Sequence, residues 1–129
     1  MRYLLDVNVL VALGVRQHQF YDRMENWVRE QPKSTQLLTS SIVELGFVRI
    51  LSQVTAYDFS VREAIALLGE MKKFWSLQVY PDAREALHLP KWVKSHQQVT
   101  DGHLVDLAQA HGALLATFDK QIPSAFLIP

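Results

Sequence analysis

The sequence contains no cysteine at any of its 129 positions. Disulfide bonds, thiolate metal sites and cysteine nucleophiles are therefore excluded, and a reducing compartment suits the chain. The sequence also has no excess of either charge, because 13 Lys and Arg residues balance 13 Asp and Glu residues. A chain without net positive charge has no global field that attracts nucleic acid, so any basic contact with RNA must be local.

Long apolar runs are absent too. The longest candidate, YLLDVNVLVALGV, is interrupted by Asp6 and Asn8 and is not followed by a cleavage-like Ala-x-Ala, so it is neither a membrane span nor a signal peptide. We therefore expect a cytoplasmic protein without membrane contact. Apolar residues make up 49% of the chain and charged residues 20%, the balance of an ordinary folded protein, and the length suits a single domain over residues 1–129.

Short apolar segments alternate with amphipathic ones along the whole chain. The apolar segments lack hairpin signals between them and are apolar on both faces, as strands of a parallel sheet are. The sequence therefore predicts an α/β fold with a short, mainly parallel central sheet flanked by helices. The predicted strands are residues 3–5, 37–39, 77–80, 113–118 and 125–128, and the predicted helices are residues 8–14, 18–29, 40–51, 60–75 and 100–112, with a weak helix at 82–89 and a loop at 90–98.

Polar residues mark the predicted helix starts. Asn8 and Thr100 are suitable N-caps, and Ser60 with Glu63 forms a capping-box sequence. The helix at 40–51 begins at Ser40 or Ser41. Because its apolar residues occupy most of its faces, we expect this helix to be largely buried.

Two carboxylates stand where predicted strands end. Asp6 is the first polar residue after the strand at 3–5, and Asp119 is the first after the strand at 113–118. Ligands of open α/β sheets bind at the carboxyl ends of the strands, and the two acids would lie close together if their strands are neighbours. Local roles fit as well, because Asp6 can cap the first helix and Asp119 can begin a turn.

Two further carboxylates share helix faces with apolar residues. Glu44 and Asp101 each lie within about 60° of the apolar residues three, four and seven positions further on. Asp106 lies about 140° from Asp101 and is expected to face water. Local roles are again open, with Glu44 as partner of Ser41 in a capping box and Asp101 as a first-turn acid favoured by the helix dipole.

Four such carboxylates are hard to explain by four separate local roles. No Lys or Arg shares a predicted inward face with them, and a buried carboxylate without a partner is costly. Two carboxylates 4 Å apart repel by up to ~4 kcal/mol at an effective dielectric constant of 20. A divalent cation would turn this repulsion into a binding site. Oxygen ligands without Cys or a His pair suit Mg²⁺ or Mn²⁺, ions that promote attack by water at phosphorus.

Three segments together, LLDVNVLVAL, SSIVELGFVRIL and VTDGHLVDLAQAHGALLATFD, resemble the PIN-domain ribonucleases, and specifically the VapC-type toxins of bacterial toxin–antitoxin pairs. The resemblance spans about residues 3–122 and implies a PIN-like α/β/α sandwich. It implies a Mg²⁺- or Mn²⁺-dependent endoribonuclease that hydrolyses RNA phosphodiester bonds with a metal-activated water. The partners it implies are the RNA substrate, a cognate antitoxin protein and a second copy of the chain in a homodimer.

The resemblance also assigns roles to individual residues. The acidic quartet of the family corresponds to Asp6, Glu44, Asp101 and Asp119 as catalytic residues, with Asp6, Asp101 and Asp119 as the metal ligands. Asn8 and Thr117 would orient metal-bound water or a neighbouring carboxylate, as residues behind a metal site commonly do.

The basic residues have two open interpretations. Arg49 lies about 140° round its helix from Glu44, so it is either an RNA contact or a solvated or ion-paired side chain. Lys91 and Lys94 flank Trp92 in the loop at 90–98, and together they could grip phosphates and stack a base. An exposed polar loop anchored by one Trp explains the same residues.

Other functions remain to be separated from this one. A haloacid-dehalogenase-like phosphatase is faintly suggested by Asp6, but that class needs a second Asp where Asn8 stands. A non-catalytic, metal-stabilised binding module is the other alternative. The periodicity of Phe20, Met24 and Trp27 favours core packing, whereas the resemblance favours an antitoxin groove at these helices.

Overall fold

A five-stranded parallel sheet forms the centre of the molecule in a computed structural model that describes residues 1–129. The strand order is β3-β2-β1-β4-β5, and every pairing is parallel. The predicted α/β class with a parallel sheet is thus confirmed. The strands are β1 (Arg2–Leu5), β2 (Gln36–Ser40), β3 (Gln78–Tyr80), β4 (Leu114–Thr117) and β5 (Phe126–Leu127).

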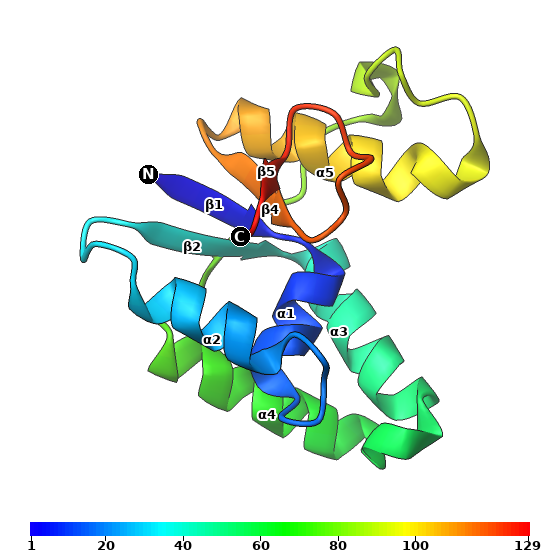
Figure 1. Ribbon diagram of the computed structural model, residues 1–129. Coiled ribbons are helices and arrows are strands. Elements are labelled where there is room, and N and C mark those ends of the chain that lie inside the picture. The colour runs from blue at the N-terminus through cyan, green and yellow to red at the C-terminus, as the bar shows by residue number, and fades with distance from the viewer.

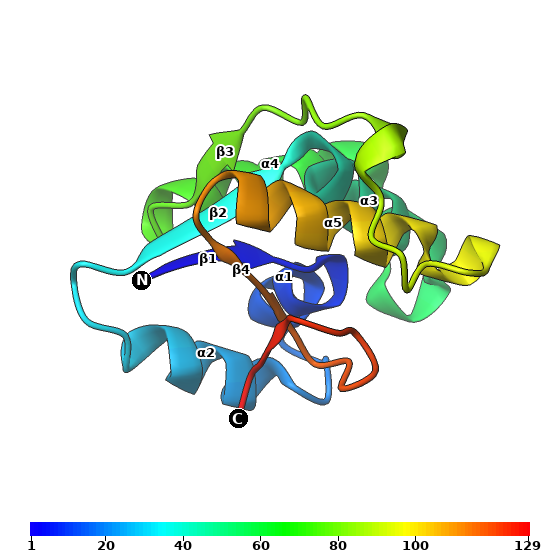
Figure 2. The same ribbon diagram turned by 90° about the horizontal axis from the view of Figure 1, so that it is seen from above.

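Helices cover both faces of this sheet. Figure 1 shows α5 on one side of the strands, and α1, α2 and α4 on the other. Seen from above in Figure 2, the N-terminal end of α5, in yellow, lies at the edge where β1 runs into α1. No helix is long and apolar enough to span a bilayer. The helices are α1 (Val7–Gly14), α2 (Tyr21–Arg29), α3 (Ser41–Gln53), α4 (Val61–Phe74) and α5 (Val99–Ala110), with short 3₁₀ turns at Thr55–Tyr57, Ala86–His88 and His96–Gln98.

The core is continuous through the sheet because the central strand is buried on both faces. Tyr3, Leu4 and Leu5 are all buried, although successive side chains of a strand point to opposite faces. The ring of Tyr3 lies 5.1 Å from that of Trp27 in α2 and 5.0 Å from that of Phe126 in β5, measured between centroids. These aromatic contacts hold α2 and the last strand against β1.

Two predicted caps are wrong. Asp6 caps α1, because its Oδ1 accepts the N–H of Val7 at 2.8 Å; Asn8 lies one residue inside the helix and is exposed. The strand ends at Leu5 as predicted, but the helix already begins at Val7, so Asp6 is the single residue between the two elements. Thr100 lies inside α5, since the 3₁₀ turn at His96–Gln98 leads straight into that helix.

Other helix starts agree with the sequence. Ser40 caps α3, and the Ser60–Glu63 capping box at the start of α4 is present, with both of its hydrogen bonds.

The start of the second helix differs from the prediction. It begins at Tyr21 rather than His18, because Nδ1 of His18 accepts the N–H of Phe20 in the preceding turn.

The predicted burial of α3 and the weak helix at 82–89 are only partly observed. Val43 and Phe47 of α3 are fully buried against the neighbouring helices, but Leu45 is 66% exposed, because those neighbours cover one face of the helix only. Within 82–89 the chain forms just the short turn at Ala86–His88.

The predicted loop at 90–98 packs against the beginning of α5. A Cβ atom at Gly102 would lie 2.3 Å from Cγ2 of Val93 and 3.4 Å from Cδ of Pro90. This close approach requires a residue without a side chain at Gly102. The segment is therefore a fixed wall beside Asp101, the residue that precedes this glycine.

A glycine pair tests this packing. We expect Gly102→Ala to lower the free energy of unfolding by about 1–2 kcal/mol, because Val93 must move and overpacking outweighs the gain in helix propensity. Gly69→Ala in α4 meets no atom within 4 Å and should raise it by about 0.5–1 kcal/mol. Urea unfolding of both variants measures the difference; equal stabilisation by both would contradict a tight contact at Gly102.

Candidate active site

The ends of β1 and β4 bring Asp6 and Asp119 together. Leu5 lies opposite Ala116 in the parallel register, and the N–H of Asp6 donates to the carbonyl of Ala116 at 3.0 Å. The strands of the two acids are therefore neighbours, as the prediction required. Thr117 joins the two: its hydroxyl donates to Oδ2 of Asp6 at 2.8 Å and accepts the N–H of Asp119 at 3.0 Å.

Asp6 is both a helix cap and a buried site residue. It is 7% exposed, and each carboxylate oxygen accepts one hydrogen bond, Oδ1 from Val7 and Oδ2 from Thr117. Burial raises its pKa above the ordinary value, the two hydrogen bonds oppose this rise, and the charge of Asp119 adds to it. The capping role and the site role are thus compatible, since the cap uses a single oxygen.

Asp101 in the first turn of α5 completes a group of three aspartates. Burial raises its pKa to about 6, and the charges of Asp6 and Asp119 contribute to the shift. The predicted inward orientation of Asp101 is therefore confirmed. All the ion pairs of the structure involve other residues, so no Lys, Arg or His side chain neutralises these three carboxylates.

Glu44 has different partners. Its Oε2 accepts the hydroxyl of Thr39 at 2.5 Å and pairs with Nζ of Lys72 at 2.9 Å. Glu44 does not cap α3, because Ser40 does. The expectation that no basic side chain shares its inward face is wrong. Lys72 follows the buried Leu68 by four residues, and this helical spacing was the signal that could have revealed it.

The middle of α5 makes two contacts that the sequence did not suggest, an ion pair of Asp106 and a hydrogen bond of His103. Asp106 was expected to face water but accepts two hydrogen bonds from Arg84, at 2.8 and 3.1 Å, which lowers its pKa. Nε2 of His103 lies 2.6 Å from Oδ1 of Asp82. Both pairs hold residues 82–84 against α5, so they support the wall formed by the following segment.

The chemistry of the three aspartates fits a hard divalent cation. Their ligand atoms are all oxygens, and they lack basic partners. The charge of Asp119 raises the pKa of Asp6, and the charges of Asp6 and Asp119 raise the pKa of Asp101. No group of three or more His, Asp or Glu side chains is arranged so that it could hold a metal ion as it stands. Mg²⁺ does not require three protein ligands in place, because it keeps several of its waters and is commonly bound through one or two carboxylates.

The remaining predicted residues lie around this group. Asn8 is exposed on the first turn of α1, two residues after Asp6. Lys91 and Lys94 are exposed in the segment that precedes α5, whereas Arg49 is an exposed residue of α3 without an ion pair.

A polar cleft adjoins the aspartates and was not foreseen as a unit. It has a volume of about 230 Å³ and opens beside Asp101 and Asp119. Its lining residues are Trp92, Ser95, Gln97, Gln98, Asp101, Asp119, Gln121 and Ile122. Glutamines of a loop and of a turn give no periodic signal, so only the folded chain reveals their proximity.

The raised pKa of Asp101 predicts a pH dependence of stability. Its pKa is about 6 in the folded chain and near 3.8 in the unfolded one, so the folded state holds the proton more tightly and stability falls as pH rises from about 4 through about 6. With a chelator present, we expect the free energy of unfolding of Asp101→Asn to be about 1 kcal/mol higher than that of the native chain at pH 7.5, a value discounted for solvent screening. The difference should vanish near pH 4 in urea unfolding. A constant difference across this range would contradict the linkage.

Comparison with known proteins identifies the family. The PIN domain family model matches residues 3–125. Ribonuclease VapC44 of Mycobacterium tuberculosis is 39% identical over 133 aligned positions, which cover 95% of this chain and 89% of that protein. Ribonuclease VapC39 of the same species is 36% identical over 134 positions, covering 95% of this chain and 91% of that protein.

Solved structures share the fold. The VapBC2 structure from Rickettsia felis, bound to a DNA fragment from its promoter, matches 98% of this chain and 97% of its own with a TM-score of 0.64 and 17% identity. Mycobacterium tuberculosis VapC20, a Sarcin-Ricin loop cleaving toxin, matches 90% of this chain and 87% of its own with a TM-score of 0.63 and 12% identity. The sheet order, the strand-end aspartates and these matches agree, and the chain belongs to the PIN-domain family, with VapC proteins among its relatives.

Proposed function

We propose that this protein is the toxin of a toxin–antitoxin pair and acts as a Mg²⁺- or Mn²⁺-dependent endoribonuclease. The observation that carries the proposal is the group of Asp6, Asp101 and Asp119, three carboxylates without a basic partner at the carboxyl edge of a parallel sheet. The relatives named Ribonuclease VapC support the same activity.

The three aspartates would hold the metal ion. When bound, the ion would supply a water of lowered pKa and neutralise charge on the phosphate. Thr117 fixes the orientation of Asp6 by donating to its Oδ2, and it also fixes the backbone of Asp119 through the N–H that it accepts. This one hydroxyl therefore positions two of the proposed ligands, as residues behind metal sites do.

Glu44 is the fourth acid of the proposed site. Lys72 and Thr39 both contact its Oε2, so Oε1 is left to act as a hydrogen-bond acceptor toward water or substrate. Asn8, on the first turn of α1, would orient a water beside Asp6. Lys91, Lys94 and Arg49 would contact phosphates of the RNA, since exposed basic side chains supply most of the sequence-independent affinity for nucleic acid.

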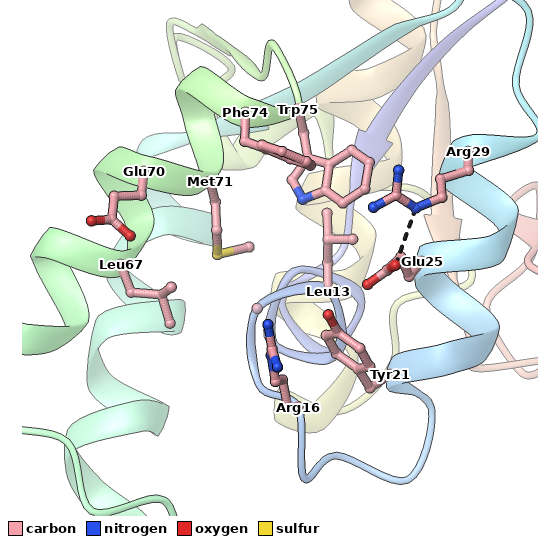
Figure 3. Close-up of a pocket in the computed structure, with 11 residues that line it drawn as sticks. Leu13, Arg16, Tyr21, Glu25, Arg29, Leu67, Glu70, Met71, Phe74 and Trp75 are labelled. Atoms are coloured by element: carbon pink, nitrogen blue, oxygen red, sulfur yellow. Dashed lines mark hydrogen bonds and ion pairs between the residues drawn. The ribbon is translucent and has the colours of Figure 1, made fainter.

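A groove between α2 and α4 is the proposed docking site of an antitoxin segment. It has a volume of about 440 Å³, and Figure 3 shows side chains of both helices facing each other across it, with Leu13 of α1 between them. Met24 and Trp27 are buried core residues. The groove is therefore formed by a different face of α2 from the one that carries these two residues.

The chemistry of this groove suits an amphipathic segment with charged residues of both signs, because Glu25 and Glu70 line it as well as two arginines. Phe74 is 67% exposed, which leaves an apolar contact uncovered. Arg29 lies 5.1 Å from the ring centroid of Trp75 and pairs with Glu25, while Arg16 lines the groove as a further cation. A homodimer is also part of the proposal, and the exposed Ile42 and Leu45 of α3 are apolar surface that a second copy would cover.

An RNA cleavage assay tests the enzymatic part. In the presence of Mn²⁺ or Mg²⁺, we expect the purified chain to cut RNA and Asp101→Asn to be at least about 100-fold slower, because a charged ligand of the ion is lost. Asp58→Asn is the matched control: Asp58 is exposed, and its positive φ of 57° is tolerated by Asn. Added Mn²⁺ should raise the midpoint temperature of unfolding of the native chain more than that of Asp101→Asn.

Other outcomes would assign the protein differently. Metal-stabilised folding without cleavage of any RNA would favour a non-catalytic binding module. Release of phosphate from small esters, with phosphorylation of Asp6, would favour the phosphatase. Equal cleavage rates for the native chain and Asp101→Asn would contradict the proposed role of the three aspartates.

A second assay tests the groove with the cognate antitoxin that the proposal requires. We expect Phe74→Glu to weaken neutralisation of the ribonuclease at least about 10-fold, because a carboxylate replaces an apolar contact without disturbing the core. Ile65→Glu on the same helix is the control, since Ile65 is 54% exposed and does not line the groove. Titration of RNA cleavage with antitoxin measures both variants; equal inhibition of the two would contradict docking in this groove.

A further inference from the structure

The cleft beside the aspartates is built from three parts of the chain. The segment before α5 contributes Trp92 and Gln97, the first turn of α5 contributes Asp101, and the turn after β4 contributes Asp119 and Gln121. Its volume is about 230 Å³. The cleft therefore shares two carboxylates with the proposed metal site, so a group bound in it would lie next to the reacting phosphate.

The wall of the cleft is held in place by its own contacts. Oε1 of Gln98 accepts the N–H groups of Lys94 at 2.7 Å and Ser95 at 3.3 Å. The close packing of Val93 on Gly102 fixes the same segment to α5. Trp92 is half-buried and packs against the hydrophobic core. An aromatic side chain is thus held at a polar cleft with little freedom to move.

The edge of the cleft offers uncommitted amides. Gln97 and Gln121 line it, and neither side chain takes part in a hydrogen bond within the protein; the backbone N–H of Gln121 alone is engaged, by Oδ1 of Asp119. An amide group can donate and accept at once. No Lys or Arg lines the cleft, so its polar groups are amides, a hydroxyl and carboxylates.

We infer that this cleft is a subsite for one unpaired adenine base of an RNA substrate. Single-stranded RNA bases are recognised by stacking on aromatic side chains and by hydrogen bonds to their edges, which Trp92 and the two amides supply. A Gln amide matches the N6 and N7 atoms of adenine, whereas O6 and N7 of guanine are matched by Arg or Lys. The inference rests on the proposed ribonuclease function and names the base that lies beside its reacting phosphate.

Binding of short RNA in a chelator tests the subsite without cleavage. The probes are fluorescein-labelled hexauridylates with one central adenosine or one central guanosine, at low ionic strength. We expect the native chain to bind the adenosine probe about 10-fold more tightly than the guanosine probe. Trp92→Leu should lose about 10-fold in affinity for the adenosine probe, and Trp92→Phe should retain most of it because an aromatic face remains.

The glutamine variants separate edge recognition from stacking. We expect the double variant Gln97→Ala and Gln121→Ala to bind the two probes equally, and Gln109→Ala, an exposed glutamine near the end of α5, to behave as the native chain. Circular dichroism establishes that each variant is folded. Equal affinity of the native chain for both probes, or unchanged binding by folded Trp92→Leu, would overturn the subsite.

The result is independent of the cleavage assay. Adenine-selective binding that depends on Trp92, in a chain that cuts no RNA with Mn²⁺, would support the subsite and refute the ribonuclease. Metal-dependent cleavage by a chain that binds both probes equally would refute the subsite and leave the ribonuclease standing.

Discussion

The parallel pairing of β1 with β4 is the constraint on which the site depends. It sets the carboxyl ends of two strands side by side, so that the hydroxyl of Thr117 reaches both the carboxylate of Asp6 and the backbone of Asp119. Without this pairing the two acids would be separated by more than a hundred residues of chain. Helix α5 precedes β4 and runs back along the sheet, as a helix connecting parallel strands must. Its N-terminal end, which carries Asp101, therefore lies at the same edge as Asp6 and Asp119.

The same arrangement sets stability against function. Burial and mutual repulsion raise the pKa values of Asp6 and Asp101, so their ionised forms weaken the fold at neutral pH. The fold tolerates Asp6 because two hydrogen bonds satisfy its oxygens, one of them as the cap of α1. Local structure thus offsets part of the free-energy cost of a carboxylate in the core. A bound cation would offset the part of this cost that the hydrogen bonds leave.

The sequence predicted those features that depend on local pattern. Alternating apolar and amphipathic segments indicated the parallel sheet, and the helical wheel placed Asp101 inward. It failed where a distant residue decides the outcome: Lys72 reaches Glu44 from another helix, and Arg84 draws Asp106 away from water. The prediction of the α1 cap failed for a different reason, because the helix begins at Val7, directly after Asp6, and leaves Asp6 to serve two roles. Long-range ion pairs and clefts carry no periodicity that a single segment could reveal.

Metal and RNA would reinforce each other at this edge of the sheet. Asp101 and Asp119 belong both to the proposed metal site and to the lining of the adjoining cleft, so without a cation their charges repel the phosphate of any base that enters. A bound divalent ion removes this repulsion and so raises the affinity for RNA. By linkage, bound RNA raises the affinity for the ion by the same factor. The neutral net charge of the chain makes this local coupling more important, because no distant positive field compensates for the carboxylates. Affinity for RNA should therefore depend on the ion as well as on Lys91 and Lys94.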